Sequence, residues 1–299
     1  MTPMITTFDA ALPNGITLAC RAAGPEDAPC IVFLHGFPEA AFVWDEVMSR
    51  LAARFRCIAP DLRGFGASSA PPEVEAYRAK VLVGDLVGLV QHLGGAPLAM
   101  LVAHDWGGAV AWNLAAQKPL LLDRLLMINS PHPATFLREL RHNPAQQQAS
   151  AYMNFLCRPD AAALLAENGY ARLFGVFGDA AWLDEPTKAR YRDVWNRGLE
   201  GALNYYRASP LKPPTKGDDE VMTLQLPPGF GTVTVPTQVL WGEADTALLP
   251  GLLDGLEGWL PHGRVRRVPG ASHWIVHEQP ALVADTIERW MAAEDPRPA

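Results

Sequence analysis

The sequence lacks the features of a membrane protein and those of a nucleic-acid-binding protein. It contains no run of about eighteen apolar residues, the length that a transmembrane helix needs. Its opening residues include neither a basic segment nor a long apolar one, so we expect no secretion signal. The net charge of -7 argues against a nucleic-acid partner. We therefore expect a cytoplasmic protein that binds neither membranes nor nucleic acids.

The sequence is also poor in cysteine and in metal-binding patterns. It has four cysteines, none of them in a CxxC pair, and three lie in apolar stretches where buried thiols are common: Cys20, Cys30, Cys57 and Cys157. His273 and His277 have the spacing of a metal-binding pair on a helix, but no third ligand is suitably spaced. We expect neither a disulfide framework nor a metal, and we expect His277 at the surface or against an inserted helical segment.

No nucleotide cofactor is expected either. The segment Asp61–Gly66 contains Gly-x-Gly but lacks the following Gly-Lys-Ser/Thr of a phosphate loop. We interpret this segment as a structural loop after a strand.

The sequence does contain an alternation of apolar runs and helical segments. Strands are predicted at 16–20, 30–34, 56–59, 98–103, 125–128, 238–241 and 265–268. Helices are predicted at 44–53, 77–93, 249–260 and 280–293, with another after Asp105. Continuously apolar strands indicate a mostly parallel sheet covered by helices on both faces. The first two runs flank a Gly-Pro loop and predict a hairpin-like opening.

Between about 131 and 228 the strand signals disappear, and the pattern becomes one of helices and loops. We interpret this stretch as a helical cap inserted into the α/β domain. The predicted division is a core of residues 1–133 and 229–299 and a cap of residues 134–228.

The segment Leu101–Gly108 ends an apolar strand on a carboxylate, Asp105. Small residues at Ala103, Gly107 and Gly108 suit a sharp strand-to-helix turn, because the helix must pack close to the strand. Such a turn lifts one side chain above the sheet and leaves the amide of Trp106 free at the start of a helix, where negative charge is stabilised.

Two further groups follow later strands. Asp245 comes just after the strand at 238–241, and His273 follows the strand at 265–268. Catalytic groups in parallel sheets gather beyond the carboxyl ends of the strands, so these side chains can converge with Asp105. An acid after the strand at 125–128 is excluded, because Asn129 is uncharged.

These motifs resemble the α/β-hydrolase fold enzymes with an aspartate nucleophile, the epoxide hydrolases and the haloalkane dehalogenases. The resemblance is sharpest at 35–38, 104–108, 129–133, Asp245 and His273. It implies an α/β-hydrolase fold in which Asp105 is the nucleophile, Asp245 the acid and His273 the base. It also implies an oxyanion hole formed by the amides of Phe37 and Trp106. Substrate contacts are expected from His35, Pro38, His104, Tyr205 and Trp274.

The cap contains two tyrosine-bearing segments that resemble those of epoxide hydrolases. Asn204–Arg207 resembles the family's Asn-Trp-Tyr-Arg segment, which implies that Tyr206 assists ring opening and that Tyr205 replaces the usual Trp. Tyr152 lies in a segment similar to Tyr-x-x-Phe/Tyr. Whether Tyr205 or Tyr206 is the second phenol stays open at this point.

The resemblance implies a cofactor-independent epoxide hydrolase that converts a small apolar epoxide and water to a vicinal diol. A haloalkane or haloacid dehalogenase with the same three residues is the alternative. Phe37 stands where haloalkane dehalogenases typically carry a halide-binding Asn, and neither Ala109 nor Ala111 supplies the Arg of fluoroacetate dehalogenases. A non-catalytic ligand-binding relative is a third interpretation. Formation of a homodimer through an apolar face of the cap stays open.

Overall fold

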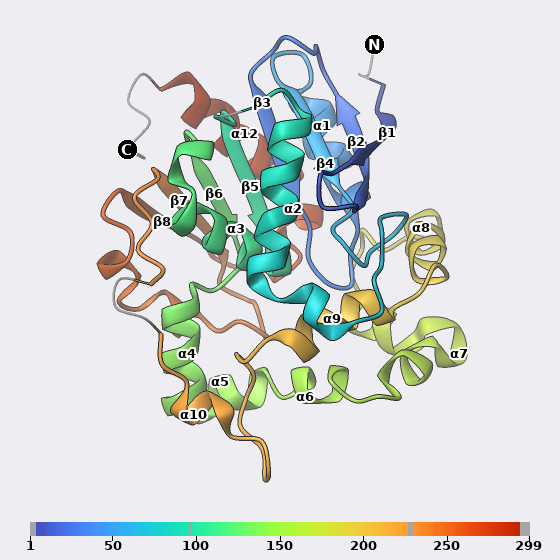
Figure 1. Ribbon diagram of the computed structural model, residues 1–299, viewed down its shortest axis with the longest axis vertical. Coiled ribbons are helices and arrows are strands. Elements are labelled where there is room, and N and C mark those ends of the chain that lie inside the picture. The colour runs from blue at the N-terminus through green and yellow to red at the C-terminus, as the bar shows by residue number, and fades with distance from the viewer. Residues whose placement is uncertain (1–3, 96, 227–229, 294–299) are drawn as a thin grey trace.

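The computed structural model describes residues 4–95, 97–226 and 230–293. In this part of the chain, eight strands form one sheet in the order β1-β2-β4-β3-β5-β6-β7-β8 (Figure 1). The strands are β1 (Thr6–Ala11), β2 (Thr17–Ala23), β3 (Cys30–Leu34), β4 (Arg56–Pro60), β5 (Met100–His104), β6 (Leu125–Ile128), β7 (Thr237–Gly242) and β8 (Gly263–Val268). From β4 to β8 every neighbouring pair is parallel, as the continuously apolar runs predicted.

The amino-terminal end of the sheet differs from the prediction. β2 pairs antiparallel with β1 and with β4, so the predicted hairpin between residues 16–20 and 30–34 is wrong. The hairpin is formed by β1 and β2, with Thr6 opposite Ala22. β1 lies at the edge of the sheet and exposes most of its side chains, so its sequence carries little of the apolar signal that reveals a central strand.

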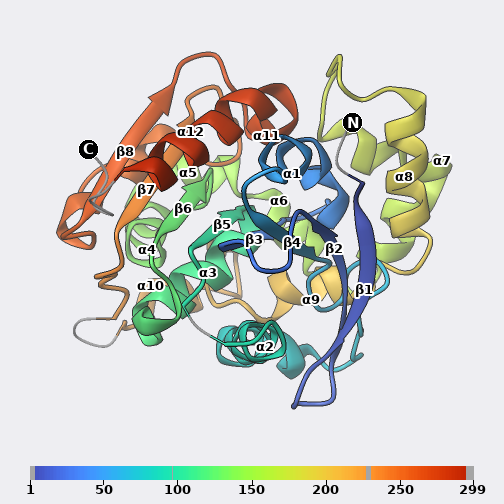
Figure 2. The same ribbon diagram turned by 90° about the horizontal axis from the view of Figure 1, so that it is seen from above.

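Helices cover both faces of the sheet. Figure 2 shows α1, α11 and α12 on one face and α2 and α3 on the other. Their bounds are α1 (Asp45–Leu51), α2 (Ala79–His92), α3 (Asp105–Gln117), α11 (Ile275–Glu278) and α12 (Pro280–Ala292). Short 3-10 helices lie at Ala41–Trp44, Val74–Tyr77, Pro119–Leu121, Pro250–Leu253 and Leu256–Gly258. The predicted helix at 249–260 is wrong: Gly255 adopts a left-handed φ of 73°, which separates two short 3-10 helices.

The remaining helices all come between β6 and β7; most of them lie below the sheet in Figure 1, and α8 lies at its right-hand side. They are α4 (Pro133–His142), α5 (Pro144–Ala149), α6 (Tyr152–Leu156), α7 (Ala161–Gly175, with non-helical residues 167–170), α8 (Glu185–Trp195), α9 (Glu200–Ala208) and α10 (Glu220–Thr223). We call them the inserted helices. The predicted boundary between 228 and 229 falls outside the described residues, and the division into core and cap stays a prediction.

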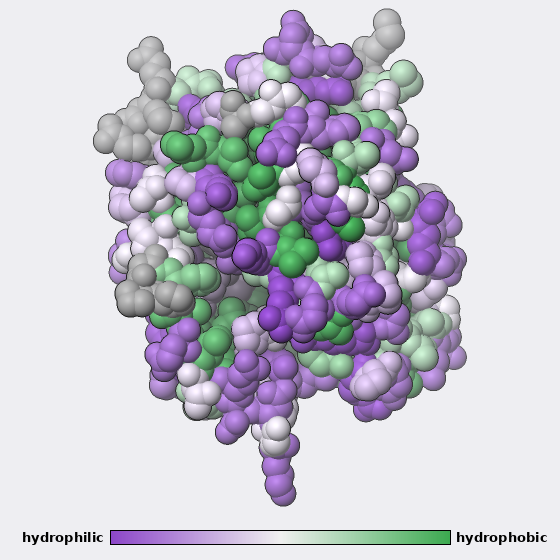
Figure 3. All heavy atoms as spheres, viewed as in Figure 1, coloured by the Kyte–Doolittle hydropathy of each residue, from purple (hydrophilic) through white to green (hydrophobic). Residues whose placement is uncertain are grey.

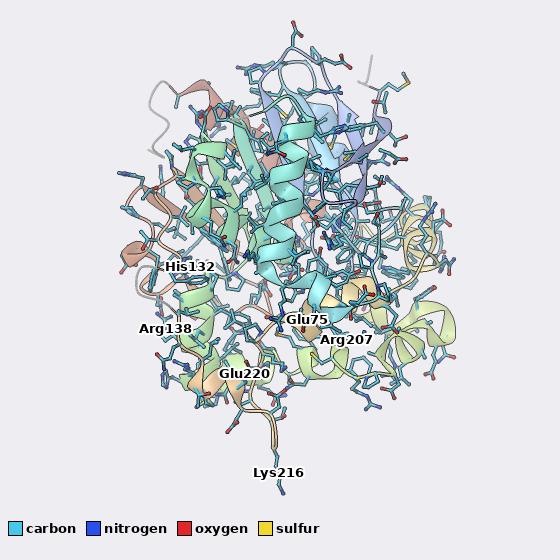
Figure 4. All side chains as sticks on the ribbon, in the orientation of Figure 1. Glu75, His132, Arg138, Arg207, Lys216 and Glu220 are labelled. Atoms are coloured by element: carbon cyan, nitrogen blue, oxygen red, sulfur yellow. The ribbon has the colours of Figure 1, made fainter. Side chains whose placement is uncertain are left out.

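The inserted helices are tied to the sheet where α4 begins. His132 lies at this junction (Figure 4), where its Nδ1 accepts a hydrogen bond from the amide of Ala134 and its Nε2 donates to the carbonyl of Gly231. Arg138 on α4 donates to the carbonyls of Gly251 and Asp254. The first inserted helix is therefore held against segments that follow it by about a hundred residues in the chain.

The core is centred on β3, β5 and β6, in which nearly every side chain is buried. Among the described residues, no helix has both the length and the apolar character that crossing a membrane requires.

The turn from β5 into α3 is packed directly against the loop that follows β3. The amide of Gly107 donates to the carbonyl of His35 at 3.0 Å. A Cβ atom at Gly107 would lie 2.5 Å from that oxygen, and one at Gly36 would lie 2.2 Å from Oδ1 of Asp105. Only glycine allows the two backbones to approach so closely.

Replacing Gly107 by Ala should therefore destabilise the protein by about 1–3 kcal/mol, because the new methyl group overlaps backbone atoms. Urea denaturation followed by circular dichroism measures this. Gly84→Ala is the matched control: Gly84 is an exposed residue of α2, and a Cβ atom added there would have no neighbour within 4 Å. That substitution should stabilise by about 0.4–1 kcal/mol. Equal effects of the two substitutions would contradict the packing described for the turn.

Candidate active site

Asp105 stands at the start of α3 with a positive φ of 48°, which few residues other than glycine adopt. The strain is offset by contacts on either side of the residue. The Ser130 hydroxyl donates to the Asp105 carbonyl at 2.8 Å, and the Phe37 amide donates to Oδ1 at 2.7 Å. One carboxylate oxygen is thus held by a backbone donor, while Oδ2 is left for chemistry.

Three of the predicted catalytic side chains converge here. His273 Nδ1 lies 2.6 Å from Oδ2 of Asp245, and His273 Nε2 lies 3.7 Å from Oδ2 of Asp105. The shorter contact orients the imidazole, and the longer one is an ionic contact without a hydrogen bond. Asp105, Asp245 and His273 follow β5, β7 and β8. The sheet brings them together, as the order of strands and motifs in the sequence predicted.

Asn129 holds the Asp245 carboxylate in place, a role not expected from the sequence. Its side-chain amide donates to Oδ2 of Asp245 at 2.8 Å, and its oxygen accepts from the Gly242 amide at 2.8 Å. The other oxygen of Asp245 accepts from the amides of Ala247 and Leu248. With this many donors, Asp245 is a fully bonded buried carboxylate. The signal that could have revealed Asn129 is a polar residue directly after an all-apolar strand.

The charges in the site stabilise one another. Burial opposes protonation of His273, but Asp245, Asp105 and Glu39 outweigh it and raise its pKa to about 9. Burial also acts to raise the pKa of Asp245, yet the positive charge of His273 and its hydrogen bond lower that pKa overall. At neutral pH the main form is therefore an imidazolium between two carboxylates.

A second buried network lies behind His273. The Glu39 carboxylate contacts His104 Nδ1 at 3.1 Å, His277 Nε2 at 2.9 Å and the Tyr191 hydroxyl at 3.2 Å. Burial disfavours ionisation of Glu39, but hydrogen bonds from His104 and His277 hold its pKa well below the usual range. His104 Nε2 in turn donates to the backbone carbonyl of His273. The expectation that His277 faces the inserted helices agrees with its contact to Tyr191 on α8.

Two cavities meet at Asp105. The smaller, of about 210 Å³, lies against α3 and is lined mostly by apolar side chains. The larger, of about 630 Å³, lies under α6 and α7. The residues common to both linings are Asp105, Tyr152 and Tyr206. Figure 3 shows a recess between the sheet and the inserted helices with apolar side chains around it. A bound molecule can therefore extend in two directions from Asp105.

The hydroxyls of Tyr205 and Tyr152 differ in their hydrogen bonding. Tyr205 borders the smaller cavity with its ring, but its hydroxyl donates to the Arg63 carbonyl at 3.0 Å. In the described part of the chain, the Tyr152 hydroxyl has no hydrogen-bond partner in the protein. Burial raises the pKa of Tyr206 well above its usual value, and burial likewise raises that of Tyr152. Both phenols therefore keep their protons at neutral pH.

Only some of the residues that were predicted to contact substrate line a cavity. Pro38 and Trp274 line the larger cavity. His35 and His104 line neither, so the expectation that they touch substrate is corrected. His35 is fully buried, donates to the Gly36 carbonyl and accepts from the Leu62 amide. Both rings are buried at the ends of their strands and hydrogen-bond neighbouring segments.

Comparisons with known proteins identify the fold family of this chain. A family model described as alpha/beta hydrolase fold matches residues 29–280, so the chain belongs to the α/β-hydrolase fold family. The predicted fold is thereby confirmed.

Epoxide hydrolases stand among the relatives and structural neighbours, which confirms the predicted resemblance. The chain is 37% identical over 285 residues to the AB hydrolase superfamily protein YfhM of Bacillus subtilis, covering 93% of this chain and 95% of that protein. It is 30% identical over 327 residues to an epoxide hydrolase of Caballeronia sordidicola, covering 94% and 92%. The structure of Bacillus megaterium epoxide hydrolase in complex with an inhibitor matches with a TM-score of 0.86, 29% identity, and coverage of 96% and 100%.

The electrostatic coupling in the site can be measured directly. Asp105→Asn removes a negative charge 3.7 Å from His273 Nε2, so the pKa of His273 should fall by about one to three pH units from its value of about 9. Titration of the imidazole signals by NMR reads this out. His132, whose pKa burial lowers to about 4, should titrate identically in both proteins. An unchanged His273 titration would show that Asp105 does not act on it.

Proposed function

We propose that this protein is an epoxide hydrolase that acts without a cofactor on a small apolar epoxide. The observation that carries the proposal is the meeting of two cavities at one carboxylate, Asp105, together with two phenols, Tyr152 and Tyr206, that keep their protons. A carboxylate nucleophile suits displacement at a saturated carbon, and a phenol suits protonation of the departing alkoxide.

In the first step, Oδ2 of Asp105 attacks an epoxide carbon. The carbon–oxygen bond breaks, its electron pair passes to the epoxide oxygen, and a tyrosine of the inserted helices gives that oxygen a proton. The product is an ester of Asp105 with a free hydroxyl on the neighbouring carbon. Oδ2 is the attacking oxygen because Oδ1 is held by the Phe37 amide.

In the second step, water breaks this ester. The ester has no negative charge, so one of the interactions that raise the pKa of His273 is lost; the imidazolium releases its extra proton to solvent until the carboxylate is restored, and the neutral imidazole can act as a base. His273 takes a proton from water, and the hydroxide attacks the Asp105 carbonyl carbon while the Phe37 amide, and by expectation that of Trp106, hold the oxyanion. Of the two protons from water, one completes the diol and the other restores the tyrosine.

The test is a product assay on two substrates, styrene oxide and 1-bromobutane, with diol and bromide measured. Diol without bromide is expected. Bromide without diol would mean that Asp105, Asp245 and His273 serve the alternative activity, that of a dehalogenase. Binding without either product would support the non-catalytic interpretation.

The tyrosines provide a matched pair of variants. Tyr206→Phe should slow single-turnover alkylation of Asp105 about tenfold to a hundredfold, because one of two proton donors is lost. Tyr205→Phe should leave that rate nearly unchanged, because the hydroxyl it removes bonds the Arg63 carbonyl instead of facing the cavity. Rapid-quench measurement with limiting epoxide gives both rates. A larger effect at Tyr205 would reverse the assignment of the second phenol.

A further inference from the structure

The two cavities that meet at Asp105 differ in charge. Apart from Asp105 itself, the lining of the smaller cavity includes no ionised side chain among the described residues. The larger cavity is bordered by His273, whose positive charge is shared with Asp105 and Asp245, and by one arginine, Arg172 on α7. Arg172 is exposed to solvent and also lines the larger cavity.

Arg172 differs from three other arginines of the segment between β6 and β7. Arg158 pairs with Asp160, Arg192 with Glu185 and Arg207 with Glu200. In the described part of the chain, Arg172 has no carboxylate partner, and it contacts the face of Phe155, 5.9 Å from the ring centre. Phe155 also lines the larger cavity. An arginine held over an apolar wall with its hydrogen-bond donors unused is suited to bind an anion.

We propose that the larger cavity takes the longer arm of an epoxide and that Arg172 binds a carboxylate at the end of that arm. The inference rests on the proposed function, since it identifies the class of substrate that the same site accepts. An apolar arm occupies the smaller cavity, the epoxide lies at Asp105, and the carboxylate stays in partial contact with water at Arg172.

Charge also limits the length of the arm. Asp105 is negative before reaction, so a carboxylate close to the epoxide would be repelled by the nucleophile. The whole chain carries a net charge of -7, which disfavours the approach of any anion except where a local cation offsets it. Epoxides with a carboxylate on the neighbouring carbon should therefore be poor substrates, and those with a distant carboxylate good ones.

The test compares two epoxides of equal length, one ending in a carboxylate and one ending in a primary alcohol. Arg172→Met keeps an unbranched apolar side chain. It should raise KM for the carboxylate about fivefold, and it should leave kcat for the carboxylate and both KM and kcat for the alcohol nearly unchanged. Arg172→Lys should keep most of the preference. Arg158→Met is the matched control, because Arg158 lies equally far from the Phe155 ring but is paired with Asp160 and lines neither cavity. Raising the ionic strength to about 1 M should weaken the carboxylate preference of the unmodified enzyme.

A binding measurement separates this inference from the proposed function. Calorimetric titration with a saturated carboxylate and the matching alcohol requires no turnover. Tighter binding of the carboxylate, lost in Arg172→Met and kept in Arg158→Met, supports the site even if no epoxide is hydrolysed. Hydrolysis of styrene oxide with equal binding of carboxylate and alcohol would leave the proposed function standing and overturn the role of Arg172. Equal losses for both ligands in Arg172→Met would also overturn it.

Discussion

The close packing of the β5–α3 turn on the loop after β3 is the constraint on which the site depends. The turn forces Asp105 to a φ of 48°, and glycines at positions 36 and 107 remove the Cβ atoms that would prevent the contact. The same contact places the Phe37 amide 2.7 Å from Oδ1 of Asp105. Local strain at one residue thus positions both a carboxylate and the donor that would stabilise negative charge on it.

The second constraint is electrostatic. His273 lies between Asp105 and Asp245, and its pKa is raised to about 9 because their charges outweigh the cost of burial. Behind it, His104, which itself contacts Glu39, donates a hydrogen bond to the backbone carbonyl of the same histidine. Such an arrangement responds to chemistry at Asp105, because any reaction that neutralises this carboxylate weakens the hold on the His273 proton. In the proposed reaction, the base thus becomes available when an ester is present to be hydrolysed.

Structural features that depend on local sequence pattern and on strand topology could be predicted from the sequence. Asp105, Asp245 and His273 each follow a buried apolar strand, and parallel strands bring such residues to one edge of a sheet. The hairpin prediction failed because β1 is an exposed edge strand without an apolar pattern, and the helix at 249–260 failed because Gly255 breaks it. The prediction that His35 and His104 contact substrate failed for another reason. Whether a ring beside a catalytic residue faces the cavity or the wall behind it depends on packing between distant segments, and so do the contacts of Asn129 and the unpaired state of Arg172.

The central claim is that Asp105, not water, attacks the epoxide. A single turnover in water labelled with heavy oxygen, with enzyme in excess over styrene oxide, tests it most directly. The account predicts that the diol from this first turnover carries no label and that the label is found in the peptide containing Asp105, because the oxygen given to the product comes from the carboxylate. A labelled diol with an unlabelled Asp105 would mean that water opens the ring directly, and would contradict the account.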